Sequence, residues 1–190
     1  MITDAGADPK VSALVYVAAL QPDVGEAGGA LMSKFAAPND AMRAAKNRAN
    51  ADKYFFIPAA KFRETYAADV PAADAQFLAD SQQQLGEKAM GAPATVAAWH
   101  NKPTYAILTT QDHVINPDLQ RWMYQRSGAK VTEVAASHAV FFSQLVNASC
   151  FMTERIERIS AGLRKNRNLL MRPLQAALNA RSPTNSYPSN

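Results

Sequence analysis

Residues 105–138, YAILTTQDHVINPDLQRWMYQRSGAKVTEVAASH, contain two strand patterns on either side of a helix pattern. Residues 105–110 form an apolar run rich in strand-forming side chains, and residues 131–136 form a second, weaker run of the same kind. Continuous apolar runs, rather than alternating ones, are typical of strands in a parallel sheet that is covered on both faces. The stretch therefore predicts two strands of a parallel sheet.

A helix is predicted between these two strands. Asn116 can cap its first turn, Pro117 suits its first helical position, and Gly128 can end it. A strand, a helix and a strand within so few residues predict a right-handed βαβ crossover, in which the two strands are parallel neighbours. The predicted fold class is therefore α/β.

Two further segments precede this unit. Residues 11–20 (VSALVYVAAL) form a continuous apolar run after Pro9, which predicts a fully buried strand. The segment from residue 25 to about residue 93 is rich in alanine and aromatic residues, and it has helical composition over residues 59–68 and 71–90. It predicts an all-helical insertion between two strands.

Charge is unevenly distributed along the 190 residues, whose net charge is +4. Residues 1–144 hold 13 Lys and Arg against 14 Asp and Glu, a sum of −1, whereas residues 145–190 hold 7 against 2, a sum of +5. Apolar side chains recur at helical spacing over residues 152–163, and residues 181–190 have the composition of a disordered end. We therefore expect one folded domain over residues 1–144, followed by a basic helical tail.

Two side chains that can carry chemistry follow the strands of the βαβ unit: Asp112 follows the first strand and His138 follows the second. Reactive groups in open α/β sheets gather beyond the carboxyl ends of the strands, so these side chains are expected to meet. Each residue alone is as readily explained by a turn or a polar surface. As a pair, a carboxylate can orient an imidazole that acts as general base and then as general acid.

Residues 98–144 resemble the acid and histidine region of the α/β-hydrolase superfamily, in the bacterial branch similar to plant hydroxynitrile lyases and methylesterases. Residues 10–26 are similar to the strand and loop that follow the nucleophile helix in that branch, and residues 54–82 are similar to its helical cap. The resemblance implies a partial hydrolase fold of about three parallel strands. It further implies that Asp112 is the triad acid and His138 the general base, acting on a small ester-like substrate without a cofactor. Hydrolase and lyase share the triad, so both reactions stay open.

The serine that would complete the triad has no counterpart in this chain. The family carries that serine in a G-x-S-x-G elbow, and no such motif occurs in the 190 residues. Because the family places the elbow just before the stretch that begins at Met1, we expect a missing N-terminal half and an inactive chain. Ser12 is expected in a buried strand, Ser81 in the cap and Cys150 beyond the resemblance, so none is expected to replace it. A misassigned start, a disrupted gene and a repurposed fold stay open.

Other functions fit the sequence less well. His100 and His113 offer metal-ligand types beside the candidate pair, but their spacing matches no zinc motif. The basic tail can meet phosphates but has no aromatic stacking platform, so binding to nucleic acid is not expected. No apolar run reaches the roughly 20 residues of a membrane span, and no export signal begins the chain. A single cysteine fits a reducing compartment, so we expect a cytoplasmic protein.

A non-catalytic interaction protein is the alternative to an enzyme. The expected loss of the N-terminal half removes strands that would flank the first strand of this chain. One sheet edge and an apolar face would then be exposed, and self-association through that edge is the expected result.

Overall fold

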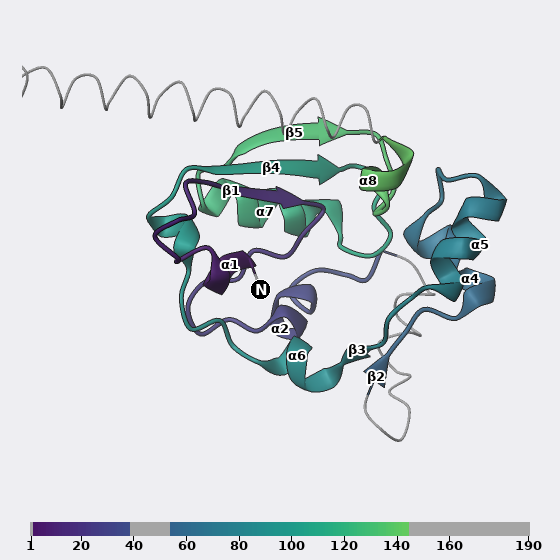
Figure 1. Cartoon of the computed structure of the whole chain (residues 1–190), viewed down its shortest axis with the longest axis horizontal. Coiled ribbons are helices and arrows are strands. Elements are labelled where there is room, and N and C mark those ends of the chain that lie inside the picture. The colour runs from purple at the N-terminus through teal and green to yellow at the C-terminus, as the bar shows by residue number, and fades with distance from the viewer. Residues whose placement is uncertain (1, 39–53, 145–190) are drawn as a thin grey trace, which may run out of the picture. The chain divides into compact units, whose positions relative to one another are not determined.

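A three-stranded parallel sheet forms the centre of the described structure (Figure 1). The computed structural model describes residues 2–38 and 54–144, which all belong to one unit of the chain spanning residues 1–149. In the order in which they pair, the strands are β1 (Leu14–Val17), β4 (Thr104–Thr109) and β5 (Lys130–Val134). The predicted parallel sheet of about three strands and the parallel pairing of the two later strands are thereby confirmed.

Among the strands described in this sheet, only β4 is buried along its whole length. β5 is largely exposed, and β1 fully buries only alternate side chains, Leu14 and Tyr16. The strand predicted over residues 11–20 exists as β1, but it is shorter than predicted, and the prediction that it is fully buried is wrong. Ala18 ends it, because its φ of 43° lies in the left-handed region and interrupts the extended backbone.

The helix between β4 and β5 is α7 (Pro117–Arg126), as predicted. Asn116 caps it, since its side-chain oxygen accepts a hydrogen bond of 2.8 Å from the backbone N–H of Asp118. Gly128 follows the helix with a φ of 63°, a conformation that favours glycine. Apolar side chains of α7 join those of β1, β4 and the 3₁₀ helix η1 (Ala98–His100) in the main hydrophobic core.

The prediction of an all-helical insertion between β1 and β4 is wrong. Within the described residues, β2 (Tyr54–Phe55) pairs antiparallel with β3 (Leu85–Gly86) in a separate small sheet. The helices that the structure describes in this segment are α2 (Gly28–Met32), α4 (Ala59–Tyr66), α5 (Ala72–Asp80) and α6 (Glu87–Gly91). The predicted first helix therefore exists as α4, but the predicted helix over residues 71–90 is interrupted.

Side-chain hydrogen bonds explain where that second helix stops. The Ser81 hydroxyl donates back to the carbonyl oxygen of Phe77 at 2.6 Å, at the C-terminal end of α5. The Gln82 side chain exchanges hydrogen bonds of 2.8 and 2.9 Å with the backbone of Ile57. These bonds hold the chain beside the segment that follows β2, where it continues as β3 rather than as helix.

The helices α4 and α5 form a second hydrophobic cluster, which we call the cap core. Its buried members are Phe62, Ala67, Val70, Ala75, Ala79 and Ala139. Ala139 follows His138 and precedes the short helix α8 (Val140–Ser143). The loop that carries His138 is therefore packed into the cap core.

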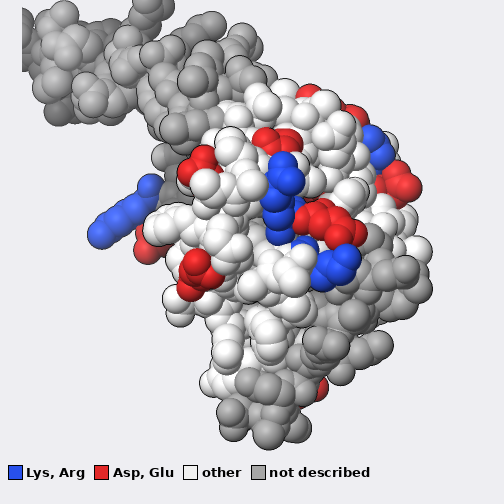
Figure 2. Space-filling view, turned by 90° about the vertical axis from the view of Figure 1, so that its right-hand side faces the viewer, with Lys and Arg blue, Asp and Glu red and all other residues white. Residues whose placement is uncertain are grey.

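Charged side chains of both signs are interspersed on the face shown in Figure 2, where uncharged residues cover most of the described surface. The remaining short helix, α1 (Ile2–Ala5), lies near the start of the chain. Among the residues that the structure describes, none of the helices has both the length and the apolar character needed to span a bilayer. The predicted basic helix, its disordered end and Cys150 lie outside the described residues, so the tail and its boundary at residue 144 stay predictions.

Candidate active site

The two candidate catalytic residues meet at one end of the sheet. Asp112 lies just after β4 and His138 just after β5, which are parallel neighbours, so both residues leave the sheet at the same edge. The Asp112 Oδ2 atom is 2.8 Å from the Nδ1 atom of His138. In Figure 1 the arrowheads of β4 and β5 point toward α8 and toward the cap helices α4 and α5.

Asp112 is buried, with only 1% of its surface exposed, and both of its oxygens accept hydrogen bonds. Oδ1 accepts from the backbone N–H groups of Val114 and Ile115 at 2.8 and 2.9 Å. Oδ2 accepts from the Thr109 hydroxyl at 2.8 Å and from the Gln120 side-chain amide at 2.9 Å, in addition to its bond with His138. The carboxylate is therefore fixed in one orientation with its charge directed at the imidazole.

The surroundings of Asp112 favour its ionised form. Burial opposes ionisation, but the hydrogen bond with His138, the positive charge of that imidazole and the backbone N–H groups of Ile115 and Val114 outweigh it. The net effect holds the pKa of Asp112 below its usual value. Asp112 is thus an anion at neutral pH, as a group that stabilises an imidazolium must be.

Gln120 is a functional candidate that the sequence analysis did not identify. It is fully buried on α7, where its side-chain N–H donates to Asp112 and also to the carbonyl oxygen of Ile115 at 3.0 Å. Its side-chain oxygen accepts from the backbone N–H of Thr109 at 3.3 Å. The sequence contained one feature that could have identified Gln120. It is a polar residue on the same helical face as Leu119 and Met123, where an apolar residue is expected.

His138 is held in place by the cap. Its ring packs edge-on against the ring of Tyr66, with 4.8 Å between the ring centroids. The backbone N–H of Ala139 donates to the carbonyl oxygen of Tyr66 at 3.0 Å. On either side, the hydroxyls of Ser137 and Ser143 both donate to the carboxylate of Asp69, the latter at 2.7 Å. Asp69 thus connects the loop between α4 and α5 to both ends of the His138 segment.

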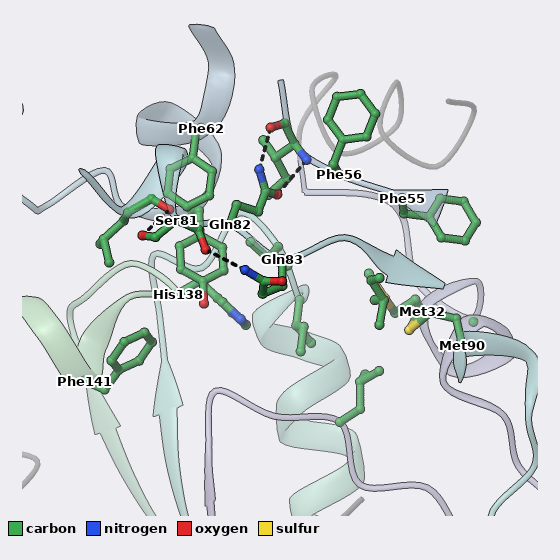
Figure 3. Close-up of a pocket in the computed structure, with 18 of the residues that line it drawn as sticks. Met32, Phe55, Phe56, Phe62, Ser81, Gln82, Gln83, Met90, His138 and Phe141 are labelled. Carbon is green, nitrogen blue, oxygen red and sulfur yellow. Dashed lines mark hydrogen bonds between the residues drawn. The ribbon is translucent and has the colours of Figure 1, made fainter. Parts of the chain in front are cut away.

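His138 also lines a pocket with a volume of about 660 Å³ (Figure 3). Because Nδ1 faces Asp112, Nε2 on the opposite side of the ring is left available, and 15% of the side chain is exposed. The other lining residues come from α2, β2, α4, α5, β3, α6 and α8 and from the loops between these elements and after β1 and β4, and they are mostly aromatic or aliphatic. The labelled examples in Figure 3 include Phe55, Phe62, Met32 and Met90. No Asp, Glu, Lys or Arg of the described residues lines the pocket.

The other two histidines lie apart from this pair. The Nδ1 atom of His113 is 3.0 Å from the carbonyl oxygen of Glu64. The Nε2 atom of His100 is 2.8 Å from a carboxylate oxygen of Asp23, and its ring stacks on Trp99. Among the described residues, no group of three or more His, Cys, Asp and Glu side chains is placed to hold a metal ion.

The serines considered as substitute nucleophiles lie in unsuitable places. Ser12 is exposed and precedes β1, so the expectation that it lies in a buried strand is wrong. Ser81 lines the pocket, but it ends α5 instead of standing between a strand and a helix, and its hydroxyl donates to Phe77. Cys150 lies outside the described residues.

Comparison with solved structures shows the same fold in several hydrolases. A pyrethroid hydrolase from Sphingobium faniae JZ-2 is 18% identical, with a TM-score of 0.60 over 80% of this chain and 66% of that one. A methylesterase from Arabidopsis is 14% identical, with a TM-score of 0.60 over 82% and 63% of the two chains. Polyneuridine aldehyde esterase is 13% identical, with a TM-score of 0.63 over 80% and 65%. The chain therefore spans just under two thirds of the length of these structures.

Comparison at the level of sequence identifies the family. No curated protein matches the chain. A family model described as the alpha/beta hydrolase family matches residues 1–146, which include every strand and helix described above. Because this match covers more than half of the sequence, the chain belongs to the alpha/beta hydrolase family.

Proposed function

We propose that this chain carries the acid, the general base and the substrate pocket of a serine-type ester hydrolase, and that the chain alone does not hydrolyse esters. The observation that carries the proposal is the 2.8 Å contact between Asp112 and His138 at the wall of an apolar pocket. The names of similar solved structures support ester chemistry, since they include a pyrethroid hydrolase, a methylesterase and an esterase.

In the proposed mechanism, His138 transfers protons and Asp112 stabilises its charged form. The Nε2 atom of His138 takes the proton of a serine hydroxyl as that oxygen attacks the ester carbonyl. The C–O bond to the alcohol then breaks, and the imidazolium returns the proton to the departing alkoxide, which leaves an acyl-serine. Water attacks the acyl-serine by the same route, and the products are a carboxylic acid and the free serine.

The serine is the part of this mechanism that the chain does not supply. No G-x-S-x-G motif occurs in its 190 residues. Of the serines that line the pocket, Ser33 donates its hydroxyl to Gly29 and Ser81 donates to Phe77. With acid and base but no activated nucleophile, little acceleration is expected.

A fusion tests both parts of the proposal. A segment from a family member that contains the G-x-S-x-G elbow is placed before Met1, and hydrolysis of a p-nitrophenyl ester is compared with that of the unfused chain. We expect no turnover above background from the chain alone, and turnover from the fusion together with labelling of its elbow serine by a fluorophosphonate.

Three outcomes contradict the proposal. Hydrolysis by the unfused chain would show that it has its own nucleophile. A folded fusion that neither turns over ester nor reacts with the fluorophosphonate would show that His138 does not activate a serine. Activity that survives in the fusion with His138→Ala would remove His138 from the mechanism.

Self-association without catalysis is a second candidate function, and one observation favours it. Among the described residues, β1 pairs only with β4, so its other edge has no strand partner there. Unpaired backbone N–H and C=O groups on an edge strand can pair with a second copy of the chain. Light scattering of the purified chain should then give a dimer or a larger species. A monodisperse monomer with a cooperative thermal transition would exclude this association.

A further inference from the structure

Most polar side chains in the wall of the pocket already have partners within the protein. Ser33 donates to Gly29 at 2.9 Å, and Ser81 donates to Phe77 at 2.6 Å. Both ends of the Gln82 amide are engaged with the backbone of Ile57. These groups shape the pocket, but they have little capacity left to recognise a ligand.

Tyr66 differs from them, because its hydroxyl has no hydrogen-bond partner among the described residues. Its ring is fixed from two sides, since it stacks on Phe62 with 5.0 Å between centroids and meets His138 edge-on at 4.8 Å. Tyr66 is only half-buried, and its hydroxyl is not among the buried atoms that lack a partner, so water can reach it. A ligand that displaces this water has to supply an acceptor in its place.

The lining of the pocket sets the chemical class of that ligand. Phenylalanine, leucine, isoleucine, valine and methionine side chains make up most of the wall, and no Asp, Glu, Lys or Arg of the described residues belongs to it. A charged ligand would lose its hydration without gaining an ion pair. A neutral ligand with aromatic rings fits the wall, and a volume of about 660 Å³ is enough for two rings.

We infer that Tyr66 donates a hydrogen bond from its hydroxyl to the carbonyl oxygen of a neutral, aromatic ester that binds in this pocket beside His138. The inference rests on the proposed function, because it takes the same pocket as the ester site. Tyr66 adds a donor that neither Asp112 nor His138 supplies: Asp112 only accepts, and the Nε2 atom of His138 must accept the serine proton.

The local environment keeps Tyr66 in the form that can donate. Burial and, to a smaller extent, the negative charge of Asp112 raise the pKa of Tyr66 above its ordinary value. The phenol therefore stays protonated throughout the range in which an esterase would work. The contacts with Phe62 and His138 also limit the freedom that the ring would lose on binding.

A matched pair of ligands tests the hydrogen bond without any need for turnover. Phenyl benzoate and benzyl phenyl ether have the same two rings and the same bridging oxygen, but only the ester has a carbonyl. Their dissociation constants for the full 190-residue chain are measured by displacement of the neutral dye N-phenyl-1-naphthylamine. We expect the dissociation constant of the ester to be lower than that of the ether by about 3- to 10-fold, which is the change in affinity expected from one neutral hydrogen bond.

Tyr66→Phe keeps the ring and removes the donor. In this variant the ratio between ester and ether should fall to about 1, while the affinity for the ether stays within about 2-fold. Tyr54→Phe, which removes a tyrosine hydroxyl outside the pocket lining, should leave the ratio unchanged. A ratio that persists in Tyr66→Phe, or a wild-type chain that binds neither ligand, would overturn the inference.

An infrared measurement on the wild-type chain gives a second test that needs no variant. The carbonyl band of bound, ¹³C-labelled phenyl benzoate should lie at lower frequency than in hexane, and an unshifted band would overturn the inference.

The outcomes of these experiments distinguish failure of the proposed function from failure of the role of Tyr66. Selective binding of the ester together with an inactive elbow fusion would contradict hydrolysis alone, whereas an active fusion without selectivity would contradict the role of Tyr66 alone.

Discussion

Asp112 lies at the centre of a hydrogen-bond network that also includes the candidate base His138. Its carboxylate accepts hydrogen bonds from the backbone near the end of the loop between β4 and α7, from Thr109 and from Gln120, and it also contacts His138. Such a group stabilises the fold only while it is ionised. The same network that orients the imidazole therefore makes the stability of the chain sensitive to acid.

Asp112→Asn should destabilise the chain by about 1–3 kcal/mol at neutral pH. The new side-chain amide would place its N–H group against the N–H and O–H donors that now bond to the carboxylate, and these donors would lose an acceptor. The folded pKa of Asp112 lies below its unfolded value, so its contribution is full above about pH 5 and is lost as the pH falls through the lowered pKa. Urea unfolding at several pH values should show the wild-type and variant chains converging in acid.

The control for this experiment is Asp74→Asn, which changes an exposed carboxyl in the first turn of α5. It should change the free energy of unfolding by less than about 0.5 kcal/mol at every pH. A constant difference between wild type and Asp112→Asn across the pH range would contradict the assigned ionisation of Asp112.

Gln120→Leu should cost about 2 kcal/mol of unfolding free energy, although leucine is apolar and similar in size. The change leaves the backbone N–H of Thr109 and the carbonyl oxygen of Ile115 without their partners in a buried site. Gln125→Leu, on the exposed side of the same helix, should be nearly neutral. Equal unfolding midpoints for the two variants in urea would show that the Gln120 network does not stabilise the fold.

The secondary-structure elements show how far the sequence alone could lead. The β4–α7–β5 unit was predictable because its signals are local: an apolar run, the Asn116–Pro117 start and Gly128. The meeting of Asp112 and His138 followed from parallel topology and is confirmed, whereas their catalytic role stays a prediction. The end of α5 was not predictable, because it depends on Gln82 bonding to Ile57, 25 residues away in the sequence. The partial exposure of β1 likewise depends on which strands pair with its edges.

Asp69 tests how the cap and the His138 segment are joined. Burial opposes its ionisation, but the hydrogen bonds from Ser137 and Ser143 hold the pKa of Asp69 below its usual value. Asp69→Asn should weaken these charge-assisted bonds and speed amide exchange at Ala139 and Phe142 by about tenfold. Exchange in α7 should not change, and Asp74→Asn should affect neither region. Unchanged exchange at Ala139 would show that Asp69 does not hold the His138 segment.

In the described unit as a whole, the ends of the sheet strands position Asp112 and His138, while the segment between β1 and β4 supplies most of the pocket lining. Asp112 and His138 leave the carboxyl ends of β4 and β5, and the loop of His138 packs into the cap core through Ala139. The chain spans just under two thirds of the length of the similar solved structures. What the proposed chemistry still requires is a serine within reach of the Nε2 atom of His138.

The kcat/KM for a p-nitrophenyl ester, measured in the elbow fusion, tests whether His138 is the general base of this site. His138→Ala should lower it by about 10³-fold or more, because the serine loses its proton acceptor. His100→Ala, which changes an exposed histidine paired with Asp23, should leave it within about 2-fold of the unsubstituted fusion. Equal rates for the two variants would contradict the assignment of His138 as the base, and with it the proposed ester hydrolase.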